Sequence, residues 1–295
     1  MRLQRTIKKE VTFSGIGLHT GKQAAVRIKP AARDTGIVFY RTDKGALIRA
    51  NMESVIDTAF ATTIGVNGIK IKTIEHMLAA AAGLGIDNLF IEVEGPEIPV
   101  LDGSAIELTG ILLEAGIAKQ GKKMPYIKIL KPIVYEDAHS RAVAIPFDGR
   151  RFSYYINFSH HILGQQEITL DMDETNFVKE IAPARTFGFL KDVEMLRANG
   201  LAKGGSLDNA IIVGENGVIN KSGLRFKDEF VRHKLLDSIG DLSLIGYPIQ
   251  GHIMLEKSGH TANLNFLKKL IASFDSYTLV SEEVDHSSLK VLHYN

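Results

Sequence analysis

Apolar and polar residues alternate through two separate stretches of the chain, residues 3–50 and residues 126–158. A period of two is typical of strands with one buried face, and the Gly, Pro and Asp residues between the runs predict turns. The clearest strand-like runs are residues 24–29, 36–41, 126–130, 133–135, 142–145 and 152–158. Because strands come first and helices later in both halves, the pattern favours the α+β class over alternating βαβ units.

In two other stretches the apolar residues recur with the period of a helix. Residues 73–83 are rich in Ala and Leu, which favour a helix, and a glycine ends the stretch in the manner of a C-cap. Residues 230–241 place His233 and Asp237 at positions i and i+4, so both side chains lie on one face, with Asp241 one turn later. The opposite face carries apolar residues that are expected to contact the core, namely Leu235, Leu236 and Ile239.

These two helical stretches look like one unit used twice. His76 and His233 are each followed seven residues later by a glycine, and then by a strand-like run. Four residues past the histidine, one copy has Ala80 and the other has Asp237. A diverged internal duplication explains this pattern and predicts two related halves.

A polar, structure-breaking segment at residues 120–125 separates the two halves. We therefore expect a first α+β domain at residues 1–124 and a second at residues 125–295. A chain of 295 residues is long enough for two such domains.

The second domain contains a segment that does not fit the simple strand-then-helix order. A helical pattern at residues 191–199, a glycine-rich run and a strand-like run at residues 210–213 predict an insertion near residues 191–220. Nearer the C-terminus, residues 258–261 are expected to close a strand, ahead of a final helix near residues 264–274.

Composition narrows the classes of function. Hydrophobic residues make up 45% of the chain, and the net charge of +1 gives no electrostatic reason to expect binding to nucleic acid or to an anionic membrane. The most apolar run, residues 77–86, is too short to span a bilayer, and the start of the chain lacks the apolar core of a signal peptide. We therefore expect a cytoplasmic protein.

An imidazole and a carboxylate one helical turn apart are two preset ligands for a zinc-like ion. His76 is the candidate third ligand, and Glu75 directly before it is placed to act as a general base. The chain has no cysteine, so any zinc would have nitrogen and oxygen ligands. The same spacing also occurs in surface pairs, or where a carboxylate holds a histidine, so on its own it leaves the metal site open.

Two other motifs are weaker. Residues 14–22 look like a phosphate loop, but the glycine spacing is wrong and Gln23 follows Gly21-Lys22 where Ser or Thr is needed. His19 in this segment is interpreted as a turn residue, with a role in lining the site left open. The His-Glu-x-x-His motif of zinc peptidases is absent from the sequence.

Several runs taken together resemble the UDP-3-O-acyl-N-acetylglucosamine deacetylases, the zinc amidases of lipid A synthesis. These runs are Thr-Phe-Ser-Gly-Ile-Gly-Leu-His-Thr-Gly at 12–21, Thr-Ile-Glu-His at 73–76, Gly-Leu-Gly-Ile-Asp-Asn at 83–88, Pro-Glu-Ile-Pro at 96–99, Leu-Asp-Gly-Ser at 101–104, Ala-Arg-Thr-Phe-Gly-Phe at 184–189, Glu-Phe-Val-Arg-His-Lys at 229–234 and Lys-Ser-Gly-His at 257–260. The match is loose past about residue 263. The resemblance implies two similar α+β domains packed helix to helix, each with a small insertion and with the active site between them.

The resemblance also implies a site. One catalytic zinc would be held by His76, His233 and Asp237, with Glu75 as the general base. A second catalytic histidine falls on His260, with Asp241 as its partner. The remaining catalytic residues would be a lysine beside the metal histidine, Lys234, and a threonine near the reacting carbonyl, Thr186.

The reaction implied is hydrolysis of the N-acetyl group of UDP-3-O-(3-hydroxyacyl)-N-acetylglucosamine to acetate and the UDP-3-O-acyl-glucosamine, the committed step of lipid A biosynthesis. The insertion in the second domain would form an apolar passage for the acyl chain, with selectivity at residues 195–213. Further substrate contacts are expected at Phe187, Phe158, Leu18, Met195, Gly205 and Ser206. Phe158 is equally well explained as a core residue of a strand. A monomer is expected, and the alternative function is a non-catalytic binder of UDP-sugars or acyl chains on the same scaffold.

Overall fold

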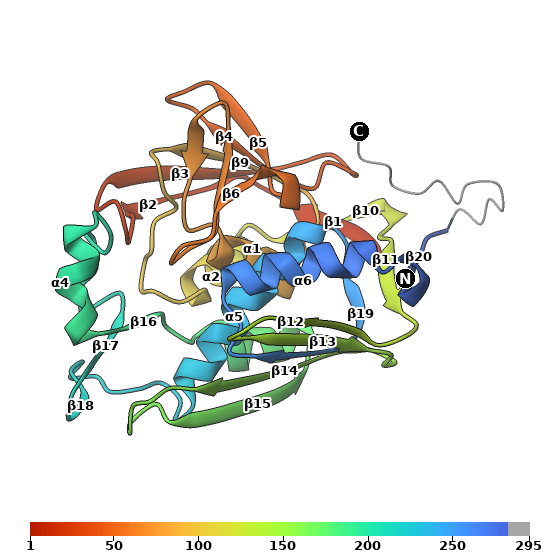
Figure 1. Cartoon of the computed structure of the whole chain (residues 1–295). Coiled ribbons are helices and arrows are strands. Elements are labelled where there is room, and N and C mark those ends of the chain that lie inside the picture. Colours follow the sequence, from red (N-terminus) through yellow and green to blue (C-terminus); the bar gives the residue numbers. More distant parts are fainter. Residues whose placement is uncertain (283–295) are drawn as a thin grey trace.

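A computed structural model describes residues 1–282 as three layers, two β-sheets with helices between them. In Figure 1 the sheet of the first half lies above the helices, and the sheet of the second half lies below them. The predicted α+β class is therefore confirmed.

The sheet of the first half has β9 at its centre, antiparallel to β3 on one side and parallel to β4 on the other. Two hairpins, β2–β3 and β4–β5, complete it. The strands are β2 (Val11–Ile16), β3 (Gln23–Pro30), β9 (Leu89–Glu94), β4 (Ile37–Arg41) and β5 (Ala46–Arg49), in that spatial order.

The second half repeats this arrangement. Its central strand β19 is antiparallel to β13 and parallel to β14, and the hairpins β12–β13 and β14–β15 complete it. The strands are β12 (Ile133–Glu136), β13 (Arg141–Ile145), β19 (Ile249–Glu256), β14 (Arg150–Asn157) and β15 (Gln165–Asp171). Because hairpins, helix and central strand follow in the same order in both halves, the predicted internal duplication is visible in the topology.

Shorter elements join and extend the two sheets. The predicted boundary at residues 124–125 falls between β10, which pairs with β1, and β11, which pairs with β19 and β20. These strands are β1 (Leu3–Ile7), β10 (Ile117–Lys123), β11 (Tyr126–Ile129) and β20 (Tyr277–Val280).

Each half carries an insertion just before its central helix. The first insertion is a small sheet of β6 (Val55–Asp57), β7 (Thr63–Val66) and β8 (Ile69–Ile71). The second combines α4 (Leu190–Ala198) with β16 (Phe187–Phe189), β17 (Ile211–Gly214) and β18 (Gly217–Val218). It follows a short helical segment made of α3 (Glu174–Asn176) and a π-helical turn, Phe177–Ile181.

The helical layer is built around α1 (Glu75–Gly83) and α5 (Glu229–Leu242), which pack directly against each other. Small residues make this close approach possible: α1 contains four successive alanines, and α5 presents Gly240 to the start of α1. A Cβ atom at Gly240 would lie 2.1 Å from the carbonyl oxygen of Glu75. Next to them, α2 (Ile106–Glu114) contacts α1 and α6 (His260–Ala272) contacts α5.

One detail of the expected structure is wrong. His260 was expected in a turn that closes a strand, but β19 ends at Glu256 and His260 is the first residue of α6. The helix therefore begins four residues earlier than the predicted start at residue 264. This matters because a helix N-terminus fixes the backbone of His260 and places Asn263 one turn after it.

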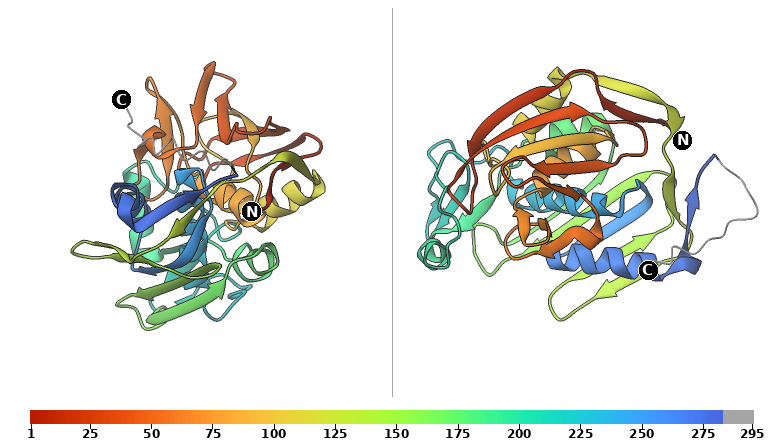
Figure 2. Two further views of the ribbon diagram at one scale, coloured as in Figure 1. Left: turned by 90° about the vertical axis from the view of Figure 1, so that its right-hand side faces the viewer. Right: turned by 90° about the horizontal axis from the view of Figure 1, so that it is seen from above.

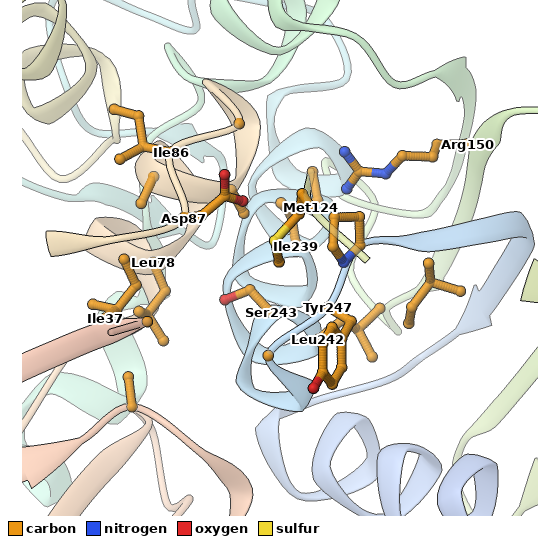
Figure 3. Close-up of a pocket in the computed structure, with 18 of the residues that line it drawn as sticks. Ile37, Leu78, Ile86, Asp87, Met124, Arg150, Ile239, Leu242, Ser243 and Tyr247 are labelled. Atoms are coloured by element: carbon orange, nitrogen blue, oxygen red, sulfur yellow. The ribbon is translucent and has the colours of Figure 1, made fainter. Parts of the chain in front are cut away.

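The seam between the two halves holds a hollow of about 120 Å³ (Figure 3). Its walls are largely apolar and include Leu78 of α1 together with Ile239 and Leu242 at the end of α5. At its rim Asp87 accepts two hydrogen bonds of 2.6 Å from the Arg2 guanidinium. The hollow contains none of the predicted site residues. Among residues 1–282, no helix is long and apolar enough to cross a membrane.

Candidate active site

Three side chains from the two central helices meet at the seam. His76 stands in the first turn of α1, while His233 and Asp237 stand one turn apart on α5. The Oδ1 atom of Asp237 lies 3.4 Å from Nε2 of His76 and 3.3 Å from Nε2 of His233. One ligand atom from each residue lies within 4.8 Å of the others, and all three residues are buried. The predicted ligand set is therefore brought together by the packing of α1 on α5.

The donor chemistry of this cluster fits a divalent metal ion. Nδ1 of His233 lies 3.0 Å from the carbonyl oxygen of Ala184, a contact that directs the proton to Nδ1 and leaves the Nε2 lone pair facing the cluster. Burial, with the nearby charges of His76 and Lys234, lowers the pKa of His233 to about 4. Metal ligation requires a neutral imidazole, which this environment supplies.

Asp237 remains ionised despite its position. Burial opposes its charge, but His233 and Lys234 nearby hold the pKa of Asp237 well below its usual range. The Lys234 ammonium donates a 2.6 Å hydrogen bond to Oδ2 of Asp237, so Oδ1 is the oxygen that faces the two imidazoles. Lys234 thus contacts the candidate ligand itself.

Glu75 is buried next to this cluster, directly before His76. Its Oε2 atom accepts a 3.0 Å hydrogen bond from the backbone N–H of Thr62. Burial raises the pKa of Glu75 to about 7, with the positive charges of His260 and His76 acting in the opposite direction. A carboxylate with a pKa in this range can both accept and release a proton at neutral pH.

A second ionisable pair completes the polar cluster. Nδ1 of His260 lies 2.8 Å from Oδ2 of Asp241, so the imidazole presents Nε2 as its free nitrogen. Burial opposes the imidazolium form, but the charge and hydrogen bond of Asp241, supported by Glu75 and Asp237, outweigh it and raise the pKa of His260 to about 9. His260 is therefore a proton donor at neutral pH.

Two contacts in this cluster were missed from the sequence. The hydroxyl of Thr62 donates to Oδ1 of Asp241 at 2.5 Å, and the Asn263 amide donates to Oδ2 at 2.8 Å. Asn263 follows His260 by three residues, so the two side chains share one face of α6. The sequence would have indicated this if the helix had been predicted to begin at His260. Thr62 lies in no recognisable motif.

Of the predicted threonine and aromatic residues, Phe187 packs against a candidate ligand. Thr186 directly precedes β16, and its backbone N–H donates to the carbonyl oxygen of Gly103 at 2.7 Å, a contact between the two halves. The Phe187 ring packs edge-on against His233, with ring centroids 6.3 Å apart, and against Phe158 at 5.9 Å. Phe158 also lines a hollow that includes Lys234, so it is not a fully buried core residue.

The other expected substrate contacts lie in the second insertion and the loop it contacts. The backbone N–H of Gly204 donates to the carbonyl oxygen of Leu18 at 3.0 Å, which brings Leu18 close to Gly205, and Ser206 follows Gly205 in the chain. Met195 lies on α4, with half of its surface exposed.

His19 occupies an unusual position in this loop. Its imidazole is buried, and within residues 1–282 neither ring nitrogen has a hydrogen-bond partner. Burial lowers the pKa of His19, which favours the neutral ring. Whether His19 is a turn residue or lines the site stays a prediction.

Such a cluster, able to hold a divalent ion and flanked by a buried carboxylate and a charged imidazole, is what metal-assisted hydrolases share. Comparison with known proteins narrows this class. A family model described as UDP-3-O-acyl N-acetylglycosamine deacetylase matches residues 4–272. The chain therefore belongs to the UDP-3-O-acyl-N-acetylglucosamine deacetylase family.

Curated relatives agree with the family model. A protein of Thermodesulfovibrio yellowstonii named UDP-3-O-acyl-N-acetylglucosamine deacetylase is 55% identical over 282 residues, 96% of each chain. Proteins of the same name from Syntrophotalea carbinolica and from Geobacter sp. strain M21 are 46% and 44% identical, over 99% and 95% of this chain and 96% and 92% of their own.

Proposed function

We infer that this chain is a hydrolase that removes the N-acetyl group of UDP-3-O-(3-hydroxyacyl)-N-acetylglucosamine. The products are acetate and the UDP-3-O-acyl-glucosamine, and the reaction is a step of lipid A biosynthesis. Family membership over nearly the whole chain supports this function. The observation that carries it is a buried candidate metal cluster with a carboxylate on one side and a carboxylate-paired imidazole on the other.

We propose that His76, His233 and Asp237 hold one zinc ion. Two imidazole nitrogens and one carboxylate oxygen suit zinc, and three protein ligands are typical of a catalytic rather than a structural site. When bound, the ion would polarise the acetamide carbonyl and lower the pKa of a water molecule at its open position.

Glu75 is the proposed general base. Its carboxylate accepts a proton from the water that attacks the acetamide carbon, and the Thr62 N–H holds that carboxylate in place. Thr186 is the proposed donor to the carbonyl oxygen as negative charge develops there. Losing one such donor typically costs roughly 3 kcal/mol of barrier.

His260 is the proposed general acid. The amine of the sugar is a poor leaving group until it is protonated, and His260 supplies the proton from Nε2 while Nδ1 stays bound to Asp241. Lys234 fixes the orientation of the Asp237 carboxylate through its 2.6 Å hydrogen bond.

We propose that the second insertion receives the acyl chain. Gly205 of the insertion lies close to Leu18 of the first half, and the Phe187 ring packs against both Phe158 and His233, which supports this proposal. Each buried methylene would contribute about 0.8 kcal/mol, so residues 195–213 would select chain length. Domain limits at residues 1–124 and 125–295, a monomeric state and a cytoplasmic location remain predictions.

The test is acetate release from UDP-3-O-(3-hydroxyacyl)-N-acetylglucosamine before and after treatment with a chelator, and again after zinc is added back. We expect turnover to stop with the chelator and to return with zinc. The Glu75→Gln variant separates metal binding from catalysis, because it should keep one zinc per chain and lose turnover. If folded, zinc-loaded protein binds the substrate but releases no acetate, the chain is a binding protein and the proposed function is wrong.

A further inference from the structure

One residue contacts both the proposed base and the proposed acid pair. The backbone N–H of Thr62 donates to Oε2 of Glu75 at 3.0 Å, and its hydroxyl donates to Oδ1 of Asp241 at 2.5 Å. We infer that Thr62 is a positioning residue, which sets the placement of the general acid relative to the general base. This inference rests on the proposed function, since Thr62 acts through groups that have roles in that reaction.

The hydroxyl proton of Thr62 has one good acceptor. The hydroxyl oxygen also lies 3.2 Å from Nδ1 of His260, but that nitrogen already points its proton at Oδ2 of Asp241, 2.8 Å away. Among residues 1–282, Oδ1 of Asp241 accepts no other side-chain hydrogen bond, whereas Oδ2 accepts from both His260 and Asn263. Thr62 therefore supplies the partner of the second carboxylate oxygen.

This partner matters because the terminal torsion of an aspartate is broad and roughly two-fold. A carboxylate held at one oxygen can rotate and exchange its oxygens, while one held at both is fixed. With Thr62 on Oδ1, the Asp241 plane is fixed and the His260 ring that donates to it keeps one orientation. The Nε2 proton of His260 is then aimed in a single direction.

Thr62 is itself anchored to the start of α1. Its carbonyl oxygen accepts a hydrogen bond of 3.3 Å from the backbone N–H of Ile74, directly before Glu75, and the residue is 1% exposed. Glu75 lies on α1 of the first half, whereas Asp241 and His260 lie on α5 and α6 of the second. Thr62 is thus attached to the half that carries the base, and its hydroxyl binds the acid pair across the seam between the halves.

The neighbouring residue provides a matched control. Thr63 is also 1% exposed, but within residues 1–282 its hydroxyl has no hydrogen-bond partner. Replacing threonine by valine at either position keeps the shape and removes only the hydroxyl. A difference between Thr62→Val and Thr63→Val therefore measures what the Thr62 hydroxyl contributes.

The experiment measures kcat and KM for acetate release, together with zinc content and melting temperature. We expect Thr62→Val to lower kcat by roughly 10- to 100-fold, with KM and zinc content unchanged. Thr62→Ser restores the hydroxyl and should recover kcat to within about 3-fold of the parent, while Thr63→Val should match the parent. If Thr62→Val does not fold, Thr62→Ala replaces it in the series.

A double-variant cycle tests the route of the effect. In an Asp241→Asn background, Thr62→Val should cost little further kcat, because the hydroxyl acts through the carboxylate. The inference is overturned if folded, zinc-loaded Thr62→Val turns over like the parent, if serine fails to restore kcat, or if the two losses simply multiply. Failure of the proposed function would look different, because the parent protein itself would release no acetate.

Discussion

Asp241 controls the charge of the imidazole beside it. Its carboxylate is buried, and it binds His260, Asn263 and Thr62 at once. Because Asp241 is the largest influence that opposes burial, it is what keeps the pKa of His260 at about 9. In the proposed mechanism, the proton needed by the leaving amine is therefore present across the neutral range.

Asp241→Asn should move the alkaline limit of activity to lower pH. An acid catalyst must be protonated, so activity falls as pH rises through its pKa, and loss of the Asp241 charge lowers that pKa. We expect the alkaline limb of kcat/KM to shift acidward by about one pH unit or more. Asp171→Asn, a change on the exposed surface where Asp171 pairs with Arg151, should leave the profile in place. An unshifted limb in Asp241→Asn would remove His260 from the acid role.

The sequence could predict only part of this network. His233 and Asp237 are one helical turn apart, so local geometry alone places them together. Thr62 contacts Glu75 and Asp241 across sequence separations of 13 and 179 residues. Contacts of this kind are set by how helices and loops pack, and a single sequence carries no periodic signal for them.

At the scale of elements, the close approach of α5 to α1 depends on a glycine at the point of contact, Gly240. Gly240 faces the backbone of Glu75 so closely that a Cβ atom would lie 2.1 Å from its carbonyl oxygen. The clash would be with backbone atoms of Glu75, which cannot move aside as the end of a flexible side chain can. A side chain at position 240 would therefore force the two helices apart. The same contact sets the distance between His76 on α1 and Asp237 on α5.

Gly240→Ala should therefore destabilise the fold and weaken metal binding together. Overpacking typically costs about 1–3 kcal/mol, and separation of the helices also spreads the ligand atoms. Gly110→Ala is the control, because Gly110 lies in α2 and a Cβ there meets nothing within 4 Å. It should raise stability by about 0.5–1 kcal/mol and leave metal affinity alone. Chemical denaturation and zinc titration measure both, and equal effects of the two variants would contradict this account.

Elements were predicted more successfully than their ends. The alternating runs identified β3, β4, β12, β13 and β14, because each sheet has one buried and one exposed face, but no run was predicted at β15. The small sheet of β6, β7 and β8 was missed, since its short strands show no clear alternation. The predicted start of α6 is four residues late because residues 258–261 were expected to close a strand, and Gly259, the N-cap, has no side chain that could signal a helix start.

At the scale of the whole molecule, the candidate metal site connects the two halves. His76 belongs to the first half, and His233 and Asp237 belong to the second. An ion that binds all three ligands binds only the assembled structure. Its binding free energy therefore adds directly to the stability of the fold.

Zinc removal should accordingly lower the unfolding midpoint. At a free zinc concentration 100 times Kd, the folded state gains about 2.7 kcal/mol, which corresponds to several degrees in Tm. Asp237→Ala should show no dependence of Tm on zinc, and the surface variant Asp171→Ala should behave like the parent. Calorimetry with and without a chelator measures the shift. A zinc-dependent Tm that survives Asp237→Ala would mean that the ion binds elsewhere.

The division of the ligands between halves also bears on how the protein is made. Synthesis proceeds from the N-terminus, and more than half of the chain lies between His76 and His233. A nascent chain that has released only its first half offers an ion one of the three proposed ligands, His76, which is too little to retain it. Capture must wait until α5 has emerged from the ribosome and packed on α1. With the proposed ligand set, metal loading would mark the completion of folding, and an incomplete chain would withdraw no zinc from the cell.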